Sequence, residues 1–180
     1  EKADNFLGAY SGAATMFGTT GGVMEAALRT AQAILTGEQL PKLVFEEIRG
    51  LEGIKETKVV IAGEEIRIAV AHGLGHVGEV LERVRRAKAD GTSMPYHFIE
   101  VMACPGGCIG GGGQPYGVTD AVRKQRMQGL FADDRDRAVR CSHDNPEVKQ
   151  VYDEFLGKPL SEKAHELLHT TYHARPVYVR

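Results

Sequence analysis

The sequence has few cysteines, no long apolar run and almost no excess of either charge. Three cysteines among 180 residues are too few for a disulfide framework, so a disulfide-stapled secreted fold is excluded. A net charge of −2 gives no basis for binding nucleic acid or an anionic membrane. No apolar run approaches the roughly 20 residues that a membrane helix needs, so we expect no membrane span.

The beginning of the chain lacks two further features. The opening EKADNFLGAY has no charged region followed by an apolar stretch, so the sequence predicts no signal peptide and a cytoplasmic location. The chain also starts without methionine, which is typical of a fragment or a processed chain. The hydrophobic fraction of 42% and the charged fraction of 26% are those of an ordinary globular protein with one domain-sized core.

Strand and helix patterns alternate through the first half of the chain, and helices dominate after it. Helices are predicted for 19–37, 78–91, 121–138, 145–157 and 161–172. Two strands around a turn are predicted over 57–73, and a mostly apolar strand over 96–103. This order predicts an α/β fold with a parallel or mixed sheet flanked by helices, followed by a helical C-terminal tail.

The apolar positions of these segments give a set of expected core contacts. Asn145 and Ser161 are expected to cap the last two helices. The strand that ends at Met102 is expected to be central and parallel to strand 66–71, because both are nearly continuous apolar runs. The helical residues expected inside are Val23, Ala27, Leu28, Ala31, Ile34, Leu35, Val80, Leu81, Val84, Val148, Val151, Tyr152, Phe155, Leu156, Ala164, Leu167, Leu168 and Tyr172.

The stretch GLGHVG, residues 73–78, matches the G-x-G-x-x-G pattern of dinucleotide-binding folds. It lies between a predicted strand and a predicted helix, as that pattern requires. The next strand, however, leads to Glu100 only 27 residues after Gly73 and runs straight into a cysteine loop. The context therefore favours a tight strand-to-helix turn over an NAD site.

The stretch HELLH, residues 165–169, matches the H-E-x-x-H pattern of zinc hydrolases. A third ligand should come from elsewhere in the fold. Only eleven residues follow, and His173 lies one turn further along the same predicted helix, from where it cannot easily close a tetrahedral site. Surface histidines beside an apolar stripe are the favoured interpretation.

Two cysteines four residues apart lie in the glycine-rich stretch MACPGGCIGGGGQP. Glycines occupy positions 106, 107 and 110–113 around Cys104 and Cys108, which predicts a sharply bending backbone or a close approach to a bound group. A disulfide, a zinc ion and an iron–sulfur cluster are the alternatives, and the sequence has no second C-x-x-C pair for zinc. Glycines around thiolates leave room for a bulky cluster and expose backbone N–H groups to its sulfurs. Cys141 is interpreted as an ordinary cysteine.

The stretch FIEVMACPGGCIGGGGQP resembles the third cluster-binding motif of the iron-only hydrogenases, E-x-M-A-C-x-x-G-C-x-x-G-G-G-Q-P. All eleven fixed positions are matched. The resemblance continues in GAATMFGTTGGVMEAALRTA, in IRGLEGIKE and in NPEVKQVYDEFLGKPLSEKAHELLHTTY, so it covers nearly the whole chain. It also explains HELLH as part of a helix of the family rather than a zinc site.

The resemblance implies a site and two segments. The family's active site is the H-cluster, a cubane of four irons and four sulfides joined through one cysteine sulfur to a diiron unit. Cys104 resembles a ligand of the cubane, Cys108 the bridging cysteine, and Met102, Phe17 and Gly18 the wall of the diiron pocket. The resemblance implies that residues 1–118 form the C-terminal lobe of the catalytic domain, with 119–180 as a small-subunit-like helical segment. Taken alone, Phe17 and Met102 read as core residues.

The sequence departs from the family in what it lacks. The first two cluster motifs, with the other cubane cysteines, the proton-relay cysteine and a lysine, are absent, so the resemblance implies an incomplete half that needs the missing N-terminal half as partner. No catalytic acid or base is assigned in this half. Ferredoxin or another electron carrier would bind through other domains. The expected function is reversible proton reduction to H2; the alternatives are a cytosolic iron–sulfur assembly factor and an iron–sulfur sensor or electron-transfer relative.

Overall fold

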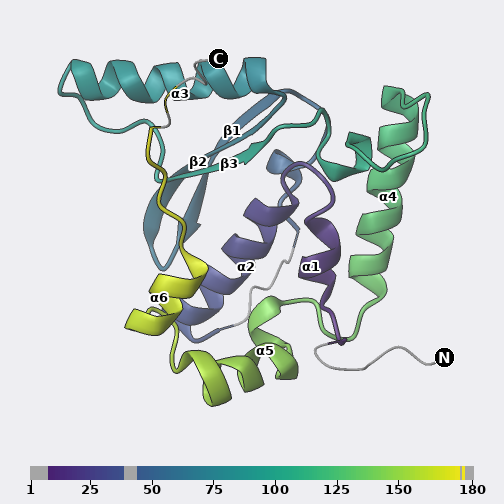
Figure 1. Cartoon of the computed structure of the whole chain (residues 1–180), viewed down its shortest axis with the longest axis vertical. Coiled ribbons are helices and arrows are strands. Elements are labelled where there is room, and N and C mark those ends of the chain that lie inside the picture. The colour runs from purple at the N-terminus through teal and green to yellow at the C-terminus, as the bar shows by residue number, and fades with distance from the viewer. Residues whose placement is uncertain (1–7, 39–43, 175, 177–180) are drawn as a thin grey trace.

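The computed structural model describes residues 8–38, 44–174 and 176, so most of the stretch examined for a signal peptide lies outside it. In chain order the main elements are α1 (Gly12–Met16), α2 (Gly22–Thr36), β1 (Ile54–Ile61), β2 (Glu64–His72), α3 (Leu74–Ala89), β3 (Phe98–Met102), α4 (Asp120–Asp136), α5 (Pro146–Val151) and α6 (Glu162–Leu168). Short 3-10 turns are η1 (Glu46–Ile48), η2 (Cys108–Gly110) and η3 (Ser142–Asp144), and a π-helical turn, η4 (Tyr152–Leu156), continues α5. Figure 1 shows this arrangement.

The sheet is mixed and has the order β1-β2-β3. Strands β1 and β2 are antiparallel, and their two-residue turn has positive φ at Ala62 (52°) and Gly63 (83°), as a type I′ hairpin turn requires. Strands β2 and β3 are parallel, with Ile68 opposite Phe98, and α3 is the crossover between them. The predicted α/β class, the hairpin and the parallel pair are therefore confirmed.

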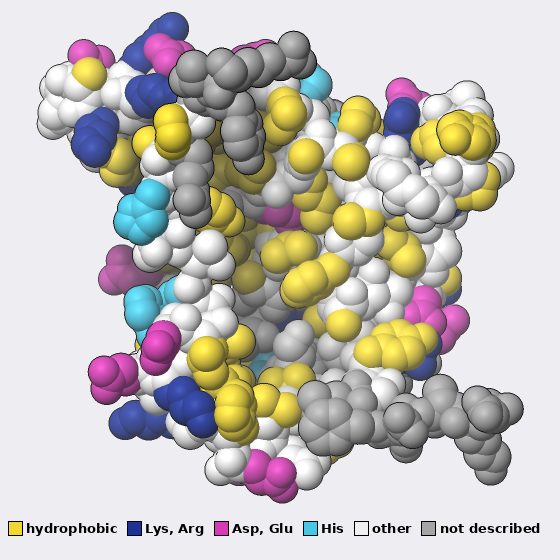
Figure 2. Space-filling view, viewed as in Figure 1, with side chains coloured by type: hydrophobic (Ala, Val, Ile, Leu, Met, Phe, Trp, Pro, Cys, Tyr) yellow, Lys and Arg dark blue, Asp and Glu magenta, His cyan; other side chains and the backbone are white. Residues whose placement is uncertain are grey.

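The prediction that β3 is central is wrong, because β3 lies at the edge of the sheet within the described part of the chain. Only Glu100 of this strand is buried; Phe98 is 42% and Val101 is 50% exposed. On the face shown in Figure 2, hydrophobic side chains gather in the middle, where Figure 1 places α1, α2 and β3. An apolar strand sequence predicts that both faces of the strand will be buried, but it does not predict that residues of the same chain will bury them.

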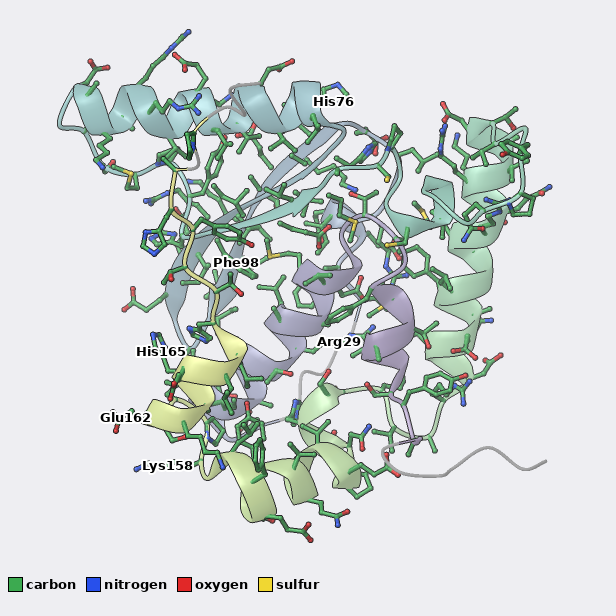
Figure 3. The ribbon with its side chains drawn as sticks, viewed as in Figure 1. Arg29, His76, Phe98, Lys158, Glu162 and His165 are labelled. Carbon is green, nitrogen blue, oxygen red and sulfur yellow. The ribbon has the colours of Figure 1, made fainter. Side chains whose placement is uncertain are left out.

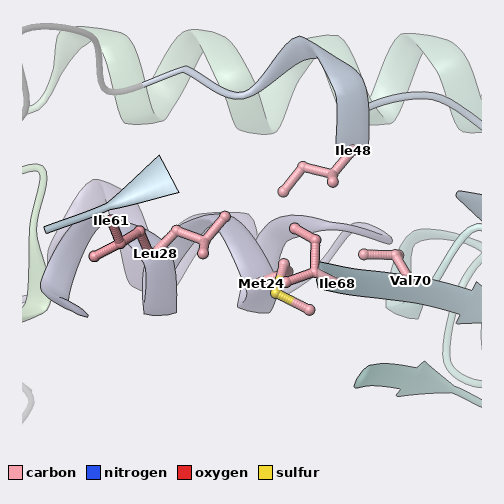
Figure 4. Close-up of a cluster of buried hydrophobic side chains, with 6 residues drawn as sticks. All are labelled: Met24, Leu28, Ile48, Ile61, Ile68 and Val70. Carbon is pink, nitrogen blue, oxygen red and sulfur yellow. The ribbon is translucent and has the colours of Figure 1, made fainter. Parts of the chain in front are cut away.

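The core lies on both faces of β2, whose side chains alternate between two layers. Ile68 and Val70 face α2 and pack with Met24 and Leu28 in the buried cluster shown in Figure 4. The opposite face of β2 packs on α3. Its buried cluster consists of Ala69, Ala71, Val77 and Val80. The sheet is thus a layer between α2 and α3, and this sandwich fixes the position of the loop that follows β3.

Helix α2 also carries a buried ionic cluster beside its sheet-facing residues. Arg29 (Figure 3) is 1% exposed and donates to Glu25 on its own helix at 2.7 Å and to Asp134 on α4 at 2.7 and 2.9 Å. Arg49 and Arg140 donate to the same two carboxylates. Burial alone would raise the pKa of Asp134, but hydrogen bonds from the two arginines outweigh it and lower that pKa. This network joins α2 to α4.

The helices of the C-terminal tail begin at the predicted caps, but several apolar side chains that were expected to be buried, in the tail and elsewhere, are exposed. Asn145 accepts from the backbone N–H of Glu147 and Ser161 from that of Ala164, so both predicted caps are present. Helix α6 ends at Leu168, and Tyr172, expected on its apolar face, lies beyond it and is 91% exposed. Other residues expected inside are also exposed, namely Ile34, Leu35, Leu81, Val148, Phe155, Leu167 and Leu168. Helical periodicity identifies an apolar face without saying whether anything packs on it.

The two cofactor-like motifs lie in a strand-to-helix turn and at the end of α6. Gly73 follows β2 directly, has a φ of 79° and donates its N–H to the carbonyl of Met102, so GLGHVG is a strand-to-helix turn. In HELLH, His169 lies just past the end of α6 in extended backbone, and its ring lies 4.3 Å from that of His165. Every helix in the described ranges is too short or too polar to cross a lipid bilayer.

Candidate metal-binding cysteine loop

The loop that follows β3 carries Cys104 and Cys108 as free thiols. Cys104 is half-buried, and Cys108, at the start of η2, is exposed. The loop closes on itself through two hydrogen bonds between residues three apart, from Gly107 N–H to the Cys104 carbonyl at 3.0 Å and from Gly111 N–H to the Cys108 carbonyl at 3.1 Å. Two thiols on one self-bonded loop, one of them open to solvent, are chemically suited to ligate a metal group from outside.

The glycines of this loop are needed for close approach. Gly107 has a φ of 91°, and a Cβ there would lie 2.8 Å from the Met102 sulfur and 2.9 Å from the Thr20 nitrogen. A Cβ at Gly111 would lie 3.1 Å from the Cys104 sulfur. At Gly112, by contrast, a Cβ would meet nothing within 4 Å. Part of the glycine run therefore allows close packing around the loop, and part of it, at Gly112, borders open space.

The segment after α1 runs alongside the cysteine loop. Gly18 accepts from the Ile109 N–H at 3.0 Å, and Thr20 donates to the Gly106 carbonyl at 3.0 Å. Phe17, at the end of α1, is 48% exposed, so plain core packing is excluded for it, whereas Met102 is half-buried with its sulfur at Gly107. The structure thus brings the two predicted segments together, and the predicted roles toward a cluster stay predictions.

His72 braces the cysteine loop from the end of β2. Its Nδ1 accepts the buried Gly106 N–H at 3.0 Å, so in the neutral ring the proton is on Nε2, which donates to the Leu51 carbonyl at 3.1 Å. Burial, the largest effect, lowers the pKa of His72 below its ordinary 6.5 and favours this neutral form. The sequence interpretation missed His72; its place at the end of a buried strand beside the loop was the available signal.

A buried acid and a buried lysine hold the start of α2 behind the loop. Glu100, the acid of the cysteine motif, accepts the N–H groups of Gly21 at 2.6 Å and Met24 at 2.7 Å. Burial raises the pKa of Glu100, although these bonds oppose the shift. Lys55 donates to the Thr20 hydroxyl at 3.2 Å, and burial lowers its pKa to about 8. The sequence interpretation considered Glu100 as a position of the cysteine motif and in the rejected dinucleotide pattern, and it overlooked Lys55.

Cys141 is close to two other residues that could ligate a metal. One ligand atom from each of Cys141, His143 and Asp144 lies within 4.8 Å of the others. The Cys141 thiol is buried, and burial raises its pKa. The His143 ring is also engaged with the Thr30 hydroxyl at 3.1 Å. The interpretation of Cys141 as an ordinary cysteine stays a prediction.

The cysteine loop has the right type of ligand for an iron–sulfur cluster but too few of them for a cuboidal one. Iron–sulfur clusters are ligated by cysteine thiolates and accept hydrogen bonds from backbone N–H groups, and the loop has both kinds of group. Its glycines leave room for a bulky cluster. A cuboidal cluster needs about four thiolates. The loop provides two, and Cys141 is buried beside α2 and α4 rather than in the loop.

Two family models match the chain. The model of the "Iron only hydrogenase large subunit, C-terminal domain" matches residues 1–112, well over half of the chain, and that of the "Iron hydrogenase small subunit" matches residues 120–175. The chain belongs to the iron-only hydrogenase family. The resemblance expected from the cysteine motif is thereby confirmed.

Relatives of this hydrogenase-family chain are longer proteins. It is 53% identical over 97% of its length to the NADP-reducing hydrogenase subunit HndD of Solidesulfovibrio fructosivorans, and covers 29% of that protein. A solved variant of [FeFe]-hydrogenase HydA1 from Chlamydomonas reinhardtii has 40% identity and a TM-score of 0.66, over 94% of this chain and 48% of that chain. A probable cytosolic Fe-S cluster assembly factor of Drosophila virilis is 34% identical over 86% of this chain and is covered to 32%. The chain thus spans about half or less of these proteins.

Proposed function

We propose that this chain is the C-terminal half of the catalytic domain of an iron-only hydrogenase, which reduces protons reversibly to H2. The observation that carries the proposal is the pair of free thiols on a glycine loop packed against the Phe17–Gly18 segment. In this proposal Cys104 and Cys108 would hold the H-cluster, with Cys104 in the role of a cubane ligand and Cys108 in the role of the family's bridging cysteine. Identities of 53% and 40% to hydrogenases support it.

In this proposal the chain contributes ligands for the H-cluster and part of the wall that shields it from water. When bound, the H-cluster would supply electron storage and an iron site for hydrogen chemistry. Cys104 and Cys108 would provide its thiolates, while Phe17, Gly18 and Met102 would line the pocket. The exposed apolar ring of Phe17 would exclude water from that pocket once it is covered. We assign no proton-relay residue to this chain.

The partners follow from the same ligand count. Two thiolates leave about half of a cubane's ligands to be supplied, and we infer that a missing N-terminal half provides them and covers the loop. We also infer a division into a lobe of residues 1–118 and a small-subunit-like segment of 119–180, which the start of α4 at Asp120 supports. Ferredoxin or another carrier would bring electrons through other domains.

We infer a cytoplasmic location from the cysteine content. Three cysteines are too few for the disulfide framework of a disulfide-rich exported protein, which supports this inference. Fractionation of cells that express the full-length protein tests the inference, because recovery of the protein in a periplasmic fraction would contradict it.

Complementation of the two halves tests the proposal. The chain alone, reconstituted anaerobically with iron, sulfide and a diiron precursor, should neither retain an H-cluster nor evolve H2. Addition of the N-terminal half of a hydrogenase of the family should give both. Cys108→Ser should abolish cluster retention and activity, and Cys141→Ser is the matched control that should retain them. Turnover near that of an intact hydrogenase from the chain alone contradicts the proposal.

An iron–sulfur assembly factor is the second candidate, because the chain is also 34% identical to such a protein over 86% of its length. The complementation experiment separates the two. An assembly role predicts that the complemented protein holds an iron–sulfur cluster by its absorbance and iron content but evolves no H2 with any diiron precursor. Hydrogen evolution with complementation rejects this second candidate.

A further inference from the structure

Helix α4 lies along the back of the candidate site and presents one stripe of side chains to it. Arg123, Arg126, Leu130 and Asp133 are spaced by three or four residues, so they share one face of the helix. Each of them contacts either the cysteine loop or the α1 segment. Helix α4 therefore contacts both parts of the site, the cysteine loop and the α1 segment.

Arg126 makes the shortest of these contacts to the loop. Its Nη1 donates to the Ile109 carbonyl at 2.7 Å, in a partly buried setting. Ile109 follows Cys108 directly, is 5% exposed, and donates its own N–H to Gly18 at 3.0 Å. The peptide groups on both sides of Ile109 are therefore fixed, one by α4 and one by the segment after α1. A charge-assisted hydrogen bond of this kind is stronger than an ordinary one.

Arg123 packs against the loop three residues earlier on the helix. An ideal Cβ at Gly106 would lie 3.0 Å from its Cδ, and one at Gly110 would lie 2.8 Å from its Nε. Its guanidinium is held by Asp120 at 2.5 Å. The side chain of Arg123 therefore lies against the loop backbone at Gly106 and Gly110. At Gly110 the Pro105 carbonyl, 2.3 Å from an ideal Cβ, crowds the position as well.

The other two residues of the stripe hold the α1 segment. Leu130 lies so close to Gly18 that a Cβ there would come within 2.8 Å of its methyl group. Asp133 accepts from the Thr15 hydroxyl at 2.7 Å, two residues before Phe17. The far end of the stripe thus fixes α1 and Gly18, while the near end fixes Ile109, the residue that follows Cys108.

We propose that α4 sets the distance between the Phe17–Gly18 segment and the cysteine loop, with Arg126 as the positioning residue for Cys108. Helix α4 belongs to the part that matches the small-subunit model, residues 120–175. That part therefore shapes the metal-binding loop rather than only covering the lobe. The bracing is a property of the metal-free chain; its relevance to a cluster rests on the proposed function.

Hydrogen exchange in the whole chain tests the bracing without any metal. Arg126→Met removes the donor and keeps the aliphatic volume, and we expect the N–H groups of Gly107, Ile109 and Gly111 to exchange about tenfold faster, as loss of a hydrogen bond to a charged group implies. Exchange in β2 should not change. Arg126→Lys should restore slow exchange in part. Arg135→Met, at an exposed arginine of the same helix, is the matched control.

Cobalt binding provides the readout for Cys108. In a Cys141→Ala background, Co(II) should give a thiolate-to-cobalt absorption band that Cys104→Ser or Cys108→Ser removes. Arg126→Met should weaken Co(II) binding about tenfold, as the same lost hydrogen bond implies, with partial rescue by Arg126→Lys. Absence of the band in the unmodified loop would count against the proposed metal site, while the exchange experiment would still judge the bracing.

Two outcomes overturn the bracing. Equal loop exchange in Arg126→Met and Arg135→Met shows that Arg126 does not hold the loop. Faster exchange in β2 as well as in the loop shows a fold-wide role rather than a local one. Slow loop exchange restored by Arg126→Lys, with β2 unaffected throughout, supports the assignment.

Discussion

The ionic interior around Arg29 and the cysteine loop are both polar, but they are satisfied in different ways. Arg29, Glu25 and Asp134 have fully buried side chains and bond one another, with Arg49 and Arg140 as further donors. The network lies entirely within the described chain, and both buried carboxylates in it have arginine partners.

The backbone of the cysteine loop is hydrogen-bonded to the rest of the chain, whereas its Cys108 thiol is exposed. The N–H of Gly106, the carbonyl of Ile109 and the N–H of Ile109 are bonded to His72, Arg126 and Gly18. Cys108, in contrast, is exposed, and Phe17 beside the loop is 48% exposed. The buried charges are therefore satisfied within the described chain, whereas the exposed thiol and the exposed ring are left open, as the proposed function expects.

The largest effect should come from the ionic interior. Arg29→Met leaves two buried carboxylates with fewer partners, and we expect the free energy of unfolding to fall by about 3 kcal/mol. Urea denaturation followed by circular dichroism measures it. Arg135→Met, at an exposed ion pair, should change the free energy by less than about 0.5 kcal/mol. A similar small loss for both variants would mean that the buried network is not what stabilises the fold.

The next effect should come from the glycines of the cysteine loop. Gly107→Ala places a Cβ 2.8 Å from the Met102 sulfur at a φ of 91°, and we expect a loss of about 2 kcal/mol from strain and overpacking. Gly112→Ala meets nothing within 4 Å and should be nearly neutral. The same urea titration compares them. If Gly112→Ala proved the more harmful, the assignment of close packing at Gly107 and open space at Gly112 would be reversed.

A smaller difference between the cysteine loop and the ionic interior should appear in the alkylation rates of their cysteines. Cys108 is exposed, whereas Cys141 is buried next to the ionic interior and its pKa is raised by burial. Iodoacetamide at pH 8 should therefore alkylate Cys108 at least about tenfold faster, since reaction needs an accessible thiolate. Peptide mapping by mass spectrometry gives both rates. The difference should disappear in urea; its persistence there would show that the fold is not its cause.

The smallest effect should be the pH dependence that His72 gives to the fold. Its pKa in the folded state is lowered below the ordinary 6.5 by burial, with Lys55 and His76 adding like charge. The unfolded chain therefore binds more protons between the two pKa values, so stability present above pH 6.5 is lost as the pH falls through this window. His72→Asn keeps an acceptor for Gly106 without titrating. Urea midpoints from pH 7.5 to 5 should fall more steeply for the unmodified chain; parallel curves would contradict this role.

Much of the fold could be predicted from local sequence, because hydrophobic period and caps act over a few residues. Asn145 and Ser161 cap as predicted, and the hairpin turn lies at Ala62–Gly63. Burial was predicted less well. The edge position of β3 and the exposure of Tyr172 depend on which surfaces meet, and apolar periodicity does not contain that information.

The candidate site divides in the same way. The sequence by itself determined the two thiols, the glycines that make room for them and the family, because a motif of eleven fixed positions is local and specific. Only the tertiary structure decided what holds the loop: His72 from β2, Gly18 after α1 and Arg126 from α4 meet there from distant parts of the chain. Their contacts depend on how the sheet and helices pack, because hydrogen bonds between residues far apart in the chain leave no periodic trace in the sequence.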